Sequence, residues 1–135
     1  MRHHIPIQIR FNDIDLFGHL NNSVYVQFFD MGKLAYFKQF MEGGFEHEPS
    51  VPVVAKIECT FLAPVHIDDR IEVRTAIVSI GESSLVLEQE IVDAAGTVRG
   101  KATTVMVNVN ARTATPEPVS RAWRDAIGAY EGREF

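Results

Sequence analysis

The feature that most constrains the fold is segment 22–41, where apolar side chains recur at helical spacing around more than half of a helix circumference. Such a segment predicts a helix about 30 Å long. Gly43 and Gly44 follow it and supply the backbone freedom that is typical of a helix end. Because so wide an apolar surface is unstable in water, the helix has to be covered by another layer of the protein. Its apolar members are Val24, Tyr25, Phe28, Phe29, Met31, Leu34, Ala35, Phe37 and Phe40.

Most of the remaining chain alternates apolar and polar residues, as half-buried strands do. One such segment, 5–11, precedes the helix, and four follow it at 53–61, 71–80, 85–93 and 98–110. The connections 81–84 and 94–97 have the composition of hairpin loops, so the last three strands form an antiparallel meander. The last strand is apolar on both sides, which favours a central place in the sheet with both faces covered.

The order of these elements predicts an α+β fold with a single domain over residues 1–135. A five-stranded antiparallel sheet would wrap around the long central helix. After Pro116 and Pro118, Ser120 is placed to cap a short C-terminal helix over 121–130.

Composition and charge argue against several classes of protein. Thirteen basic residues against eighteen acidic ones give a net charge of −5, and no basic block is present, so no nucleic-acid partner is expected. No apolar run approaches the roughly 20 residues of a membrane span, so no membrane insertion is expected. Residues 1–11 have no continuous apolar core and no cleavage site, which indicates a cytoplasmic location. Cys59 lies on an alternating strand and is interpreted as a small core residue.

Polar side chains that carry chemistry concentrate in the ten residues before and at the helix start: Asp13, Asp15, His19, Asn21 and Asn22. Unpaired backbone N–H groups collect at a helix N-terminus and stabilise negative charge. An acid or base beside these groups is a catalytic arrangement. No third carboxylate follows at calcium-loop spacing, and no histidine pairs with His19 at zinc-ligand spacing, so no metal site is predicted.

The spacing in this region is D-x-D-x-x-G-H-x-N-N-x-x-Y, which runs from Asp13 to Tyr25. This pattern resembles the hotdog-fold thioesterases of the 4-hydroxybenzoyl-CoA thioesterase type. The G-H-x-N-N form is most similar to their long-chain acyl-CoA branch, since members with benzoyl substrates carry aromatic residues there. Segments 59–75 and 96–118 extend the resemblance over most of the chain.

The resemblance implies a hotdog fold and an acyl-CoA thioesterase that hydrolyses aliphatic acyl-CoA. No separate cofactor is implied, because coenzyme A (CoA) is part of the substrate. The catalytic carboxylate falls on Asp15, as general base or nucleophile, and the oxyanion donor falls on the backbone N–H at Asn22. His19 is the third catalytic candidate and would line the pocket. Substrate-binding positions fall on Tyr25, Asn21 and Phe61. The family's assemblies imply a homodimer or a dimer-based tetramer.

The sequence also allows a structural interpretation of these residues. His19 can be a hydrogen-bonding loop residue, and Tyr25 can belong to the core. Asp15 can bond backbone N–H groups in a turn, and Asn21 and Asn22 can cap the helix. Asp13 is interpreted as a structural partner that caps the loop or orients Asp15. Because a fold does not determine a function, a non-catalytic protein that binds acyl thioesters is the alternative.

Overall fold

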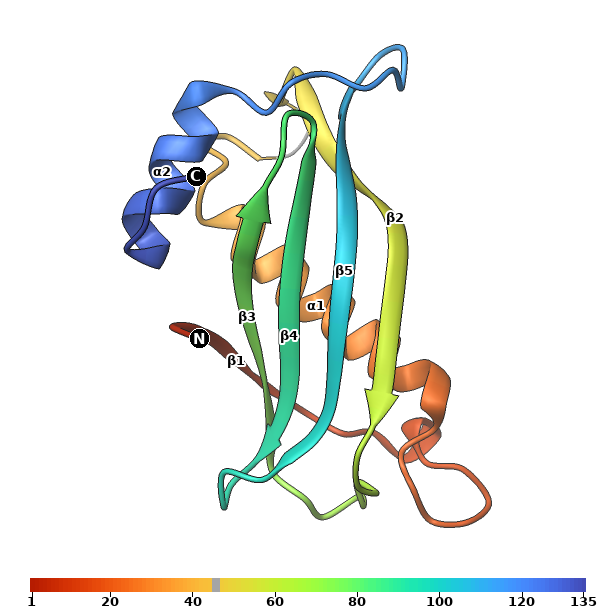
Figure 1. Cartoon of the computed structure of the whole chain (residues 1–135). Helices are drawn as coiled ribbons and strands as arrows, with labels where there is room; N and C mark the ends of the chain where they lie inside the picture. The colour runs from red at the N-terminus through yellow and green to blue at the C-terminus, as the bar shows by residue number, and fades with distance from the viewer. Residues whose placement is uncertain (45–46) are drawn as a thin grey trace.

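The computed structural model describes residues 1–44 and 47–135 and contains one sheet, a long helix and a short helix (Figure 1). The sheet is antiparallel throughout, with strand order β1-β3-β4-β5-β2. The long helix α1 lies against one face of it, so the predicted α+β architecture is confirmed. The elements are β1 (His3–Ile7), a 3₁₀ turn η1 (Phe11–Asp13), α1 (Asn22–Lys38), β2 (Ser50–Phe61), β3 (Ile71–Ile80), β4 (Ser84–Asp93), β5 (Val98–Asn110) and α2 (Arg121–Glu131).

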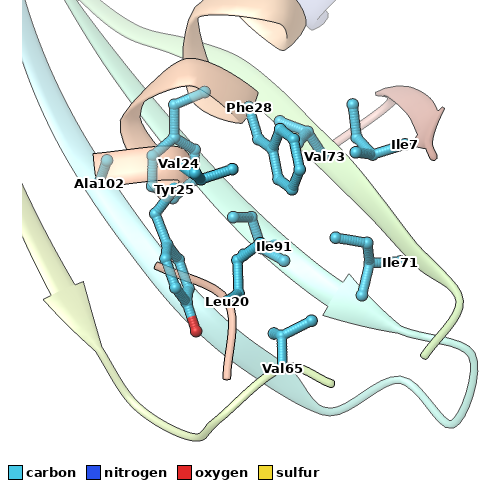
Figure 2. Packing of buried hydrophobic residues seen from close by; sticks show 11 residues of the cluster. Ile7, Leu20, Val24, Tyr25, Phe28, Val65, Ile71, Val73, Ile91 and Ala102 are labelled. Carbon is cyan, nitrogen blue, oxygen red and sulfur yellow. The ribbon is translucent and has the colours of Figure 1, made fainter. Parts of the chain in front are cut away.

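The core lies between α1 and the sheet, where α1 contacts β1, β3 and β4. Figure 2 shows Val24, Tyr25 and Phe28 from α1 facing residues of the strands. At Gly32 the helix comes so close that an added Cβ would lie 2.5 Å from a Val73 methyl carbon. Here the buried side-chain amide of Gln89 donates to the Phe29 carbonyl at 2.8 Å and so joins the helix to β4.

The helix and the sheet are both less completely covered than the sequence predicts. Met31 and Leu34 are 49% and 53% exposed on α1. Strand β5 is central, as predicted, but Val105 and Val107 on its other face are only half-buried. The prediction that both faces of β5 are covered is therefore wrong for the single chain, because α1 covers one face and, among the described residues, no helix or strand covers the other in Figure 1.

Several predicted boundaries shift because local hydrogen bonds outweigh the periodicity. The first strand ends at Ile7, not Phe11, because the Asp13 carboxylate accepts from the Arg10 backbone N–H at 2.7 Å and turns the chain. Phe11 is left 85% exposed. Helix α1 ends at Lys38, not Met41, because its last turn tightens through bonds of the i→i+3 type.

Strand β2 departs from the predicted apolar–polar alternation in its first half, although Ile57 and Cys59 further along it pack against the core cluster. A register shift between Val54 and Lys56 breaks the alternation, and Val53 is 44% exposed instead of facing the core. By contrast, β3 and β5 have the predicted bounds, and Ser120 caps α2 by accepting from the Trp123 N–H at 3.2 Å. Within the described residues, neither helix is long and apolar enough to cross a membrane.

Candidate active site

A cavity of about 230 Å³ lies where the loop before α1, the first turn of α1 and the β2–β3 connection meet. Five of the six predicted site residues line it, and Asn21 does not. A larger hollow of about 630 Å³ is lined by Met1 and by sheet residues, among them Glu58 and Lys101, and includes none of the predicted site residues. The smaller cavity is lined by Asp15, His19, Leu20, Asn22, Tyr25, Phe61, Leu62, Ala63 and Pro64.

The loop before α1 is anchored by Asp13, which is 2% exposed. Its carboxylate accepts from the backbone and the guanidinium of Arg10, and its carbonyl accepts from the Asn21 N–H at 2.8 Å. Burial acts to raise the pKa of Asp13, but the bonds from Arg10 outweigh it and hold that pKa below its usual value. Asp13 is therefore engaged in holding the loop and is not among the residues that line the cavity.

Asp15 has both a structural position and a place in the cavity. Its Oδ1 accepts from the backbone N–H groups of Phe17 at 2.9 Å and His19 at 3.2 Å, which is the turn interaction that the sequence allows. Gly18 makes this turn with a φ of +81°. Oδ2 has no hydrogen-bond partner among the described residues. One carboxylate oxygen is thus fixed by the loop, and the other is free to act on a ligand.

The first turn of α1 offers a free donor beside this carboxylate. The Asn21 side chain caps the helix by accepting from the Ser23 N–H at 3.0 Å, so it is used within the loop. The next residue, Asn22, is the first residue of the helix, and within residues 1–44 and 47–135 its backbone N–H has no acceptor. A helix N-terminus with an unpaired N–H stabilises a developing oxyanion.

Tyr25 and Phe61 form an aromatic wall of the cavity, with ring centroids 5.0 Å apart in an edge-to-face contact. The Tyr25 ring lies on β5 at Gly100, where an added Cβ would come within 2.9 Å of it. Burial raises the pKa of Tyr25, so its hydroxyl stays protonated at neutral pH and donates to the Ala63 carbonyl at 3.3 Å.

Sequence reasoning missed the opposite wall, residues 62–64, and a second histidine beside it. The His66 ring meets the His19 ring edge to face at 5.2 Å, and its Nδ1 lies 3.6 Å from the Asp69 carboxylate. No periodicity or spacing in the sequence places this connection beside the loop before α1.

Cys59 packs against the core cluster, and burial raises the pKa of its thiol, which confirms the interpretation of it as a core residue. The described residues contain no group of three or more His, Cys, Asp or Glu side chains placed to hold a metal ion.

This chain is similar to known proteins over most of its length. The acyl-CoA thioester hydrolase YbgC of Escherichia coli is 27% identical over 119 residues, which cover 87% of this chain and 89% of that protein. A crystal structure of a Thermus thermophilus thioesterase complexed with coenzyme A and Zn is 29% identical, covers 100% of both chains and superposes with a TM-score of 0.87. A Staphylococcus aureus protein in complex with CoA, SAV2348, has the same fold at 15% identity, with a TM-score of 0.87.

These superpositions confirm the predicted hotdog fold. The family described as the thioesterase-like superfamily matches residues 9–127, which include the loop before α1, the whole of α1 and all strands except β1. By this match the chain belongs to the thioesterase-like superfamily.

Proposed function

We propose that this chain hydrolyses acyl-CoA thioesters to a free acid and CoA. The observation that carries the proposal is that one cavity is lined by both Asp15 and Asn22. Among the described residues, the half-buried Asp15 carboxylate has one oxygen without a hydrogen-bond partner, and the Asn22 helix N–H is unpaired. The match to the thioesterase-like superfamily and the named activity of the E. coli relative support the proposal.

In the proposed reaction the thioester carbonyl oxygen accepts from the Asn22 N–H. The free oxygen of Asp15 either takes a proton from a water molecule that attacks the carbonyl carbon, or attacks that carbon itself. In both routes the tetrahedral oxyanion is stabilised at the helix N-terminus and collapses with loss of the CoA thiolate. In the second route, water then hydrolyses the mixed anhydride on Asp15. His19 contributes to the edge of the cavity beside Asp15.

An aliphatic acyl chain is the proposed substrate, on the basis of the G-H-x-N-N loop. Incubation with a panel of acyl-CoAs, with thiol release as the measurement, is expected to give faster turnover of medium and long acyl chains than of benzoyl-CoA or 4-hydroxybenzoyl-CoA. Faster turnover of the aromatic substrates would contradict the assignment to the long-chain branch. If no acyl-CoA released thiol but equilibrium dialysis detected binding, the non-catalytic alternative would be favoured.

We further propose that the active unit is a homodimer. Strand β2 lies at the sheet edge, and the exposed apolar residues Val53 and Val54 lie on it. Met31 and Leu34 add an exposed apolar surface on α1, and Leu16 in the loop before α1 is 97% exposed. Apolar surface of this kind is typical of a face that a partner covers, and a second copy is the partner that the family implies.

A charge placed on this surface is expected to separate the dimer. Light scattering should give about 30 kDa for a wild-type dimer, or about 60 kDa for a tetramer of two dimers, compared with the 15.1 kDa of one chain. Leu34→Glu should give the mass of a single chain. The turnover of Leu34→Glu should fall together with its molecular mass. Ala126→Glu, which adds the same charge to an exposed position on α2, is the control and should stay dimeric. A wild-type monomer with full turnover would refute the proposal.

A further inference from the structure

Residues 62–64 line the cavity, and with the buried Val65 they form one connection, the 62–65 wall, which is held by side chains and backbone from three separate elements. The carbonyls of the three consecutive residues 63–65 each accept a hydrogen bond from a different element. The Ala63 carbonyl accepts from the Tyr25 hydroxyl of α1, and the Val65 carbonyl accepts from the Leu20 N–H of the loop at 2.7 Å. Figure 2 shows the Tyr25 hydroxyl pointing away from α1 toward this connection.

Arg99 of β5 makes the third of these hydrogen bonds to the wall and two further ones through its backbone carbonyl. Its Nη1 donates to the Pro64 carbonyl at 2.8 Å, while its own carbonyl accepts from the N–H groups of Leu62 at 2.9 Å and Ala63 at 3.0 Å. Because proline has no N–H, the carbonyl is the only backbone group by which residue 64 can be held. Arg99 itself is not among the residues that line the cavity.

The guanidinium is oriented by Asp93 at the end of β4. Nε and Nη2 of Arg99 lie 2.8 and 2.7 Å from Oδ2 of Asp93. The other carboxylate oxygen accepts from the N–H groups of Ala95 and Thr97, both at 2.9 Å, so the turn fixes the carboxylate in place. The Thr97 N–H and the Arg99 guanidinium hold the pKa of Asp93 below its usual value, and the pair is charged at neutral pH.

We propose that Arg99, oriented by Asp93, is a positioning residue that sets the distance between the 62–65 wall and the Asp15–Asn22 side of the cavity. Arginine is suited to this because its planar fork presents Nε and Nη2 to the carboxylate and Nη1 to the carbonyl at the same time. Lysine keeps the charge but has no such fork. The consequence for turnover rests on the proposed thioesterase function.

Amide hydrogen exchange, measured by NMR, tests whether Arg99 holds the wall, and this test does not depend on enzymatic activity. In Arg99→Lys, the amides of Leu20, Leu62 and Ala63 are expected to exchange roughly 10- to 100-fold faster, the effect of losing one hydrogen bond to a charged group. Arg74→Lys is the matched control, because the Nε of Arg74 donates to Glu72 at 2.7 Å without touching the wall. Equal exchange at these amides in Arg99→Lys and Arg74→Lys would overturn the proposal.

Turnover tests whether the position of the wall matters. In Arg99→Lys, kcat is expected to fall about tenfold or more at unchanged melting temperature relative to Arg74→Lys. Asp93→Asn should have a similar effect alone and little added effect in an Arg99→Met background, because Asp93 acts through Arg99. Faster exchange with normal kcat would overturn the positioning role. If the wild type were inactive but the wall still exchanged faster in Arg99→Lys, the proposed function would be refuted. The role of Arg99 in holding the wall would still be supported.

Discussion

Asp15→Asn is expected to lower kcat for acyl-CoA hydrolysis by roughly 10²- to 10⁴-fold, the effect of losing a general base. The fold should be preserved, because the Asn side-chain oxygen can still accept from the N–H groups of Phe17 and His19, as Oδ1 of Asp15 does. The amide cannot accept a proton or attack the carbonyl from the position of Oδ2. Steady-state kinetics with a thiol assay should therefore show a loss in kcat with little change in KM.

Asp13→Asn is the control for this variant. Asp13 is buried and bonded to Arg10, so its loss should lower the melting temperature while the folded fraction keeps most of its turnover. If Asp13→Asn were inactive and Asp15→Asn kept its turnover, the proposed mechanism would have assigned the chemistry to the wrong carboxylate.

Asn22→Pro is expected to lower kcat by about 10²- to 10³-fold, because it removes the one backbone N–H assigned to the oxyanion. Proline is well tolerated at the first position of a helix. The preceding residue, Asn21, has φ −62° and ψ 138°, a conformation that proline favours in its neighbour. The helix should therefore form normally, and circular dichroism with thermal melting can check this while kinetics report the catalytic loss.

Asn22→Ala separates the side chain from the backbone, because it keeps the N–H and removes the amide group. Turnover close to wild type in Asn22→Ala, with a large loss in Asn22→Pro, would locate the effect on the main chain. Equal losses in both variants would show that the Asn22 side chain carries the function instead.

The parts of the fold with strong local signals were predictable from sequence. Strand β5 has the predicted bounds because its alternating residues and the flanking turn at Gly96 agree with each other. The cap at Ser120 is of the same kind, since a cap depends on residues a few positions away. At the site, Asp15 and Asn22 are candidates because they are close in sequence and adjoin a helix start, and the family resemblance is what implies their roles.

The remaining features depend on contacts between distant residues. Nothing in the alternation of β2 reveals the register shift after Val54, because the shift is a property of the pairing with β5. The bond between Arg99 and the Pro64 carbonyl joins residues 35 positions apart and leaves no periodic trace. Arg10 and Asp13, in turn, override a regular strand pattern through a local bond that periodicity does not reveal.

The close approach of α1 to the sheet at Gly32 also fixes the position of the N-terminal end of the helix. Gly32 lies ten residues after Asn22, about 15 Å along the helix axis. A larger side chain there would meet Val73 and lift the middle of the helix from the sheet. Because the helix is stiff, its N-terminal end would tilt with it, and the Asn22 N–H would change depth in the cavity. The absence of a side chain at Gly32, remote from the cavity, therefore sets the depth of the Asn22 N–H, the group proposed to bind the substrate carbonyl.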